Sequence, residues 1–526
     1  MTQPNFLLIT TDQQRADHLG CYGNDRIRTP HIDALAAHGR RFDRFYVASG
    51  VCMSNRASLM TGRLPSAHGT RCNGIPLSVA STTFVDLLRD AGYATGLVGK
   101  CHLQNMTDLP PEAPLPPVAD GLRAPGAEHA DAIRNRWAHG DYGQEKASGR
   151  VRTPYYGFDH VDLCTMHGDM VEGDYRRWLA GQVCDVDALR GPKNAMPDER
   201  YSAPQAYRTR VPEHLYPSAW VGDRAVEFLE GAAQGDRPFF LHCSFADPHH
   251  PFTPPGRYWD MYDPDDMVLP ASFYLSPERH FAPVAALHRE RAMGKTRLTS
   301  TVGFHATERE AKQALALTYG MVTMIDDVVG RVMQRLQALG LDRNTVVIFT
   351  SDHGDFMGDH GLILKSALHY QSLVRVPFIW SEFRESPSRS GATQALASTI
   401  DIGTTVLARA GLAPFLGMQG RDLAPVLAGH ELAGREAVLI EEDGHAPTFG
   451  LPVPVRARTV VTASHRLTLY DEPGWVELYD LSADPAELRN LANDPGHVAE
   501  QLRMYRTLAR ELMLADDRAP FPTGRA

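Results

Sequence analysis

Short apolar segments that alternate with helical patterns are the feature that most limits how this chain can fold. Strand-like runs are found at residues 6–10, 94–98, 238–245 and 345–350. Helical patterns lie between them, and in the longest, residues 308–339, apolar side chains recur on one side. This alternation predicts an α/β fold, with a large mixed, mostly parallel sheet flanked by helices.

The pattern changes near residue 430. Beyond it, four short strand-like segments and a helical segment at 498–513 predict a small antiparallel sheet plus a helix. A chain of 526 residues also exceeds what one hydrophobic core usually supports. We therefore expect a large domain over residues 1–430 and a small C-terminal α+β subdomain over residues 431–526. Residues 107–215 are interpreted as an insertion that covers a site, makes subunit contacts or is a surface excursion.

Composition excludes several classes of protein. The net charge is −10, which argues against a partner such as nucleic acid. No run approaches the roughly 20 apolar residues that a membrane span needs, so no membrane partner is expected. The first ten residues have no basic region, and their apolar run is too short for a signal peptide. Seven scattered cysteines fit reduced thiols, so we expect a cytoplasmic protein.

Acidic residues follow two of the predicted strands. Asp12 and Gln13 follow the first, and Asp352 and His353 follow another. Ligands gather at the carboxyl ends of strands in open parallel sheets, so these four residues are a candidate divalent-cation site. The alternative is that each aspartate only caps a turn. No glycine-rich dinucleotide motif follows the first strand, which argues against a dinucleotide cofactor.

Residues 51–63 contain a cysteine just before a helical stretch that Gly62 closes. A helix N-terminus and a nearby arginine both favour an anion and lower the pKa of a thiol. Cys52 is therefore a candidate nucleophile and Arg56 a candidate anion contact. The alternative is that Cys52 is a small buried apolar residue.

The same segment resembles the sulfatases of the alkaline phosphatase superfamily. Their signature is Cys or Ser, any residue, Pro, Ser and Arg, followed after three residues by Leu or Met, Thr and Gly. The chain matches it at Cys52, Arg56, Met60, Thr61 and Gly62. Further blocks follow in the family's order: Gly99-Lys100-Cys101-His102-Leu103, Pro248-His249-His250-Pro251, Ser351-Asp352-His353-Gly354, Gly358-Asp359-His360-Gly361 with Lys365, and residues 477–491.

The resemblance implies an alkaline phosphatase-like catalytic domain and a sulfuric ester hydrolase. In such an enzyme Cys52 is oxidised to formylglycine, which makes a formylglycine-generating enzyme a partner. One divalent metal is held by Asp12, Gln13, Asp352 and His353. Arg56 and Lys100 stabilise the aldehyde hydrate and His102 helps to break down the covalent intermediate. His249 and Lys365 bind the sulfate and assist the leaving group, and Asn73 is a further anion contact.

Two departures from the family pattern leave alternatives open. Ser54 stands where the family has Pro or Ala, which leaves the conversion of Cys52 open. Gln13 and His353 resemble the branch of choline sulfatases and phosphonate monoester hydrolases, and an imidazole ligand favours Mn²⁺ over the alternative, Ca²⁺. The alternative functions are a phosphonate monoester hydrolase or phosphodiesterase, and a non-catalytic anion-binding protein. The substrate is expected to be a small sulfated, phosphonate or phosphodiester molecule, and the chain a homo-oligomer.

Overall fold

The computed structural model describes residues 3–107, 151–382, 390–430, 434–472 and 474–518. Residues 108–150 of the predicted insertion lie outside these described residues. None of the helices in the described ranges combines the length and the apolar character that crossing a membrane requires.

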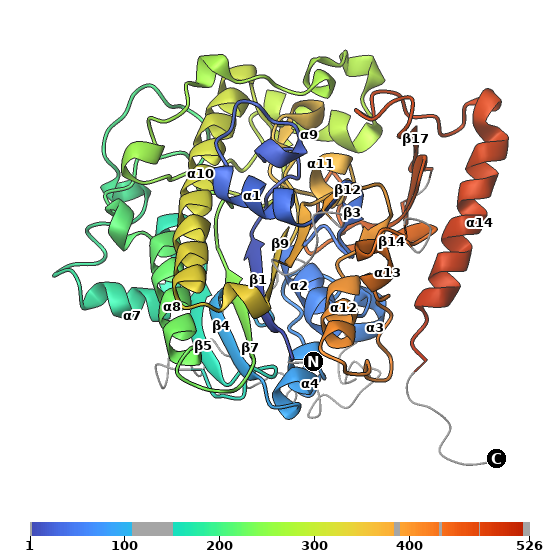
Figure 1. Ribbon diagram of the computed structural model, residues 1–526. Helices are drawn as coiled ribbons and strands as arrows, with labels where there is room; N and C mark the ends of the chain where they lie inside the picture. The colour runs from blue at the N-terminus through green and yellow to red at the C-terminus, as the bar shows by residue number, and fades with distance from the viewer. Residues whose placement is uncertain (1–2, 108–150, 383–389, 431–433, 473, 519–526) are drawn as a thin grey trace, which may run out of the picture.

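A nine-stranded sheet forms the centre of the molecule (Figure 1). Its order is β12 (Gly391–Thr393), β2 (Arg40–Phe42), β11 (Phe378–Glu382), β9 (Thr345–Ser351), β1 (Asn5–Thr11), β7 (Phe239–Ser244), β4 (Ala94–Lys100), β5 (His160–Thr165) and β6 (Glu172–Gly173). The five strands from β9 to β5 are all parallel, while β11 and β6 pair antiparallel with their neighbours β9 and β5. The predicted mixed, mostly parallel sheet is confirmed.

Helices cover both faces of this sheet because the strands are apolar on both sides. In β1, Phe6 and Leu8 pack into one hydrophobic cluster, and Leu7 and Ile9 pack into the other. The second cluster includes side chains of three helices, α1 (Pro30–His38), α8 (Pro217–Ala232) and α10 (Glu308–Ala338). The first includes side chains of α2 (Cys52–Thr61), α4 (Phe84–Asp90) and α12 (Asp401–Arg409), on the opposite side in Figure 1.

A second, four-stranded antiparallel sheet follows in the chain, as the sequence predicts. It consists of β14 (Ala437–Asp443), β15 (Arg456–Thr462), β16 (His465–Tyr470) and β17 (Val476–Asp480). The helix α14 (Val498–Ala515) packs against it through Met504 and Leu508 (Figure 1). β15 begins at Arg456 and pairs along the whole length of β14.

The described residues also form shorter elements. They are α3 (Pro65–His68), α7 (Asp174–Ala180), α9 (Ala282–Ala292), α11 (Gln371–Val374), α13 (Ala424–Leu427), and the two-stranded pairs of β10 (Leu362–Ile363) with β8 (Phe304–His305) and of β13 (Ala397–Ser398) with β3 (Phe45–Tyr46). The segment between β10 and α11 matters most for the site, because it carries Lys365 to the carboxyl edge of the large sheet.

Candidate active site

The parallel strands bring polar residues to one edge of the large sheet. Asp12 and Gln13 follow β1, and Asp352 and His353 follow the neighbouring strand β9. Because Thr11 pairs with Ser351 in register, the two acidic segments end side by side. The backbone amide of Gln13 donates a hydrogen bond to Asp352 Oδ1 at 3.0 Å. The expected meeting of these residues is therefore observed, and the strand order is its cause.

Cys52 reaches the same edge from the first turn of α2. Its Sγ lies 2.9 Å from His353 Nε2, 3.1 Å from Lys365 Nζ and 3.9 Å from Asp12 Oδ1, and the residue is 2% exposed. Burial alone would raise the pKa of this thiol, but the positive charges of Lys365 and His353 outweigh burial and lower it. Cys52 is thus a buried sulfur with cationic neighbours rather than an apolar packing residue.

Arg56 and Lys100 hold the two carboxylates from the other side. Arg56 donates from Nε to Asp352 Oδ2 at 2.8 Å and from Nη2 to Asp12 Oδ2 at 3.2 Å. Lys100, at the end of β4, donates to the same oxygen of Asp12. Burial opposes ionisation of Asp12, yet Lys100 and Arg56 hold its pKa well below the usual range. Asp12 is therefore an ionised carboxylate inside the protein.

The donor set at this edge fits a divalent cation. One ligand atom each from Asp12, Cys52, Asp352 and His353 lies within 4.8 Å of the others, and all four residues are buried. His353 Nδ1 lies 2.8 Å from the carbonyl oxygen of Gly354 and donates to it, so Nε2 is the nitrogen that would bind a metal after losing its proton. Carboxylate oxygens and an imidazole nitrogen are ordinary ligands of divalent metals.

The side chain of Gln13 contacts residues beside this group. Its Oε1 accepts from Lys365 Nζ at 3.0 Å, and its Nε2 donates to Asp355 and lies 3.3 Å from His250 Nδ1. Burial raises the pKa of Asp355 to about 6. The expectation that Gln13 binds the metal remains a prediction.

Two stacked histidines stand above Asp12, and the sequence indicated only one of them. The rings of His167 and His249 lie 3.6 Å apart, nearly parallel, and His249 Nε2 lies 3.0 Å from Lys365 Nζ. His167 Nε2 lies 2.6 Å from Lys100 Nζ. Burial lowers the pKa of both imidazoles well below the usual value. His167 comes after β5, as Asp12 comes after β1. Its position after a strand is the one sequence feature that could have indicated it as a site residue.

The remaining predicted residues lie near this group without contacting Cys52. His102 has a left-handed backbone (φ 57°), and its Nδ1 is buried without a hydrogen-bond partner among the described residues. Burial, reinforced by Lys100, lowers its pKa well below the usual value. Asn73 Oδ1 accepts a hydrogen bond from the backbone amide of Met53 at 3.2 Å, one residue beyond Cys52.

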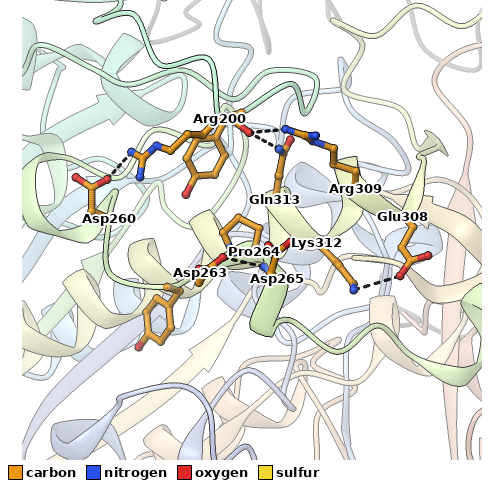
Figure 2. A pocket seen from close by; sticks show the side chains of 11 residues that line it. Arg200, Asp260, Asp263, Pro264, Asp265, Glu308, Arg309, Lys312 and Gln313 are labelled. Atoms are coloured by element: carbon orange, nitrogen blue, oxygen red, sulfur yellow. Dashed lines mark hydrogen bonds and ion pairs between the residues drawn. The ribbon is translucent and has the colours of Figure 1, made fainter.

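A hollow of about 660 Å³ lies on another part of the surface, away from Cys52 (Figure 2). Two ion pairs join side chains of its lining: Arg200 with Asp260 at 2.5 Å, and Lys312 with Glu308 at 3.2 Å. It shares no residue with the group around Cys52. We therefore assign the candidate active site to the edge of the sheet.

Models of two known protein families match the chain. The family model described as Sulfatase matches residues 4–412. A model described as the C-terminal part of N-sulphoglucosamine sulphohydrolase matches residues 358–513. The two matches together span both sheets.

Individual proteins resemble the chain along almost its whole length. An arylsulfatase of Clostridium perfringens is 28% identical over 97% of this chain and 94% of its own. A choline-sulfatase of Rhizobium meliloti is 25% identical over 95% of this chain and 84% of its own. The crystal structure of phosphonate monoester hydrolase of Agrobacterium radiobacter has a TM-score of 0.74 and 25% identity, and covers 98% of this chain and 97% of that one.

Proposed function

We propose that this chain, which belongs to the sulfatase family and is a sulfatase-type hydrolase, cleaves sulfate monoesters through a covalent intermediate on Cys52. The position of Cys52 carries the proposal. Its Sγ is buried at the carboxyl edge of the sheet with Lys365 Nζ at 3.1 Å, and Arg56 and Lys100 bind the adjacent carboxylates. Such positive groups neutralise the oxygens of a sulfate ester, which would otherwise repel a nucleophile.

The other side chains have separate roles in this proposal. Lys365 binds the sulfate oxygens, and His249, 3.0 Å from its Nζ, assists proton transfer to the leaving oxygen. His167 accepts a hydrogen bond from Lys100 and so positions that lysine beside Asp12. Asn73 lines the same pocket as Lys365 and is a further anion contact.

Formylglycine at position 52 would supply, as a hydrated aldehyde, one hydroxyl group for attack and a second for release of the sulfate. His102 suits the second half-reaction because burial keeps its imidazole neutral, and a neutral imidazole accepts a proton. We propose that Cys52 is converted, which makes a formylglycine-generating enzyme a partner of this chain.

Asp12, Asp352 and His353, with Gln13 beside them, would hold one divalent metal, which supplies positive charge toward the sulfate oxygens. The imidazole of His353 favours Mn²⁺, with Ca²⁺ as the alternative. We also propose that the protein is a homo-oligomer and acts in the cytoplasm. Sedimentation of the purified protein would test the oligomeric state, and fractionation of the native host cells would test the location.

Hydrolysis of 4-nitrophenyl sulfate by metal-supplemented protein tests the function. The wild-type chain should release nitrophenol, and Cys52→Ala should not. Cys243→Ala is a matched control, because Cys243 is a buried cysteine within β7, and it should keep most of the activity. Full activity of Cys52→Ala would reject Cys52 as the nucleophile. Tight binding of inorganic sulfate without any turnover would favour the non-catalytic alternative.

Mass spectrometry of the tryptic peptide of residues 45–56 tests the modification. Conversion replaces the thiol sulfur by an aldehyde oxygen and lowers the mass of the peptide. An intact thiol in fully active protein would reject formylglycine and leave Cys52 itself as the nucleophile.

Phosphonate monoester or phosphodiester hydrolysis is the second candidate function, because the hydrolase from Agrobacterium radiobacter shares this fold and 25% of its residues. Sulfate and phosphonate esters have similar shapes and differ mainly in charge. Comparison of kcat/KM for 4-nitrophenyl sulfate and 4-nitrophenyl phenylphosphonate decides between them. A far higher value for the phosphonate would move the assignment.

A further inference from the structure

A narrow pocket opens beside Cys52 between the two sheets. Gly50 and Val51, just before α2, form one wall with Lys365 and Ser366, and the end of β14 and the segment after it form the other. The hydroxyl of Ser366 is buried and has no hydrogen-bond partner among the described residues. Lys365 lines this pocket, so an ester whose sulfate binds at Lys365 would place its alcohol part against the other lining groups.

Glu442 supplies the carboxylate of this pocket and is 3% exposed. Its Oε2 lies 2.7 Å from the point that a Cβ on Gly50 would occupy, so the carboxylate lies against the backbone two residues before Cys52. The side chain of the preceding residue, Glu441, accepts a hydrogen bond from the backbone amide of Ser66. The carboxylates of Glu441 and Glu442 therefore bind different parts of the protein.

A chain of buried hydrogen bonds holds the Glu442 carboxylate in place. Arg466 Nη1 donates to Thr468 Oγ1 at 2.7 Å, and Thr468 lies 2.7 Å from Thr459 Oγ1. Thr459 Oγ1 lies 2.8 Å from His369 Nδ1, and His369 Nε2 lies 3.0 Å from Glu442 Oε2. The hydrogen bonds can all run in one direction, from Arg466 toward Glu442. Each threonine hydroxyl then accepts one hydrogen bond from the group before it and donates one to the group after it. In that direction His369 is neutral and donates to Glu442.

The charge of Glu442 has no full partner in the protein. Within the described part of the chain, neither a lysine nor an arginine forms an ion pair with this carboxylate, and the neutral His369 gives it only a hydrogen bond. A buried carboxylate is costly unless a positive group or several donors satisfy it. A positive group on the ligand would offset that cost in this pocket.

We propose that Glu442 determines substrate specificity by binding a protonated amine on the alcohol part of the sulfate ester. The proposal rests on the proposed sulfatase site at Cys52, because it places the sulfate at Lys365 and the alcohol toward β14. It also assigns specificity to a residue of the second sheet.

Binding to full-length Cys52→Ala protein, measured by calorimetry with metal present, tests the proposal without requiring turnover. The probes are 3-aminopropyl sulfate, 3-hydroxypropyl sulfate and n-butyl sulfate. The amine should bind about 10- to 100-fold more tightly than the butyl ester, as a charge-assisted hydrogen bond in a buried site provides. Equal affinity for the amine and either of the other two esters would overturn the proposal.

Variants of the acidic pair locate the effect. Glu442→Gln, in the same Cys52→Ala background, should bind the amine and the butyl ester equally within about threefold, while Glu441→Gln keeps the full preference. Thr459→Val breaks the hydrogen-bond chain without touching the pocket and should reduce the preference, which keeps a test available if Glu442→Gln does not fold. An unchanged preference in Glu442→Gln would overturn the proposal.

Turnover of 4-nitrophenyl sulfate separates this proposal from the proposed function. Wild-type protein should hydrolyse that ester, whose alcohol part carries no amine for Glu442 to bind. If wild-type protein hydrolyses 4-nitrophenyl sulfate but shows no preference for the amine ester, the specificity proposal alone is overturned. No hydrolysis, together with an intact amine preference in binding, would overturn the proposed reaction alone.

Discussion

Replacement of Arg56 by methionine would remove the guanidinium group between two buried carboxylates while keeping an unbranched side chain. The side chains of Arg56 and Asp352 are each 2% exposed and that of Asp12 is fully buried, so water cannot replace the lost partner. Asp12 keeps Lys100, but Asp352 Oδ2 loses its charged donor. Breaking a buried ion pair in this way costs about 3–5 kcal/mol.

Equilibrium urea unfolding in the presence of a chelator measures this cost. Arg435→Met is the matched control, because Arg435 pairs with the buried Asp401 and lies outside the candidate site. Both variants should lose about 3–5 kcal/mol in chelator. Added Mn²⁺ should stabilise Arg435→Met only as much as wild type, because both keep the same metal site. Arg56→Met should gain at least about 1 kcal/mol more than either, since it leaves two carboxylates that the metal neutralises.

Two results would refute this reasoning. A loss below about 0.5 kcal/mol in Arg56→Met would mean that Asp12 and Asp352 do not depend on the guanidinium group. Equal responses of Arg56→Met and Arg435→Met to Mn²⁺ would mean that loss of the guanidinium group leaves no extra charge on Asp12 and Asp352 for the metal to neutralise.

Three further predictions concern single residues. Asp352→Ala should lose the roughly one divalent ion per chain that elemental analysis should find in wild-type protein, together with turnover; bound metal at the wild-type level would contradict the ligand assignment. His102→Ala should slow breakdown of the covalent intermediate more than its formation, so a burst of nitrophenol should precede a slow steady state; equal slowing of both phases would contradict its role as base. Burial raises the pKa of the Asp247 carboxyl group to about 7. The folded protein therefore binds the proton of this carboxyl group more tightly than the unfolded chain does. Its contribution to the free energy of unfolding falls as pH rises from about 4 to 7. Asp247→Asn should therefore gain stability relative to wild type between pH 5 and pH 8, by at most a few kcal/mol in urea unfolding; a constant difference would contradict the raised pKa.

Much of the fold was predictable because its signals are local. The apolar run of β1 and the one-sided pattern of α10 follow from neighbouring residues along the chain, and both elements form where expected. Alternation of such elements specifies parallel strands, and parallel strands place Asp12 and Asp352 at a common edge. The ordered motifs also identify Cys52 as a site residue, because each motif consists of residues that are close together in the sequence.

Residues that reach the site from distant or weakly patterned segments could not be predicted in this way. His167 is a lone histidine in a segment without clear periodicity, and its role depends on a stack with His249 that forms only after β5 joins the sheet. Glu442 lies on an ordinary strand of the second sheet and meets Gly50 only when the two sheets pack together. Contacts between residues hundreds of positions apart depend on packing geometry, which a local sequence pattern does not encode.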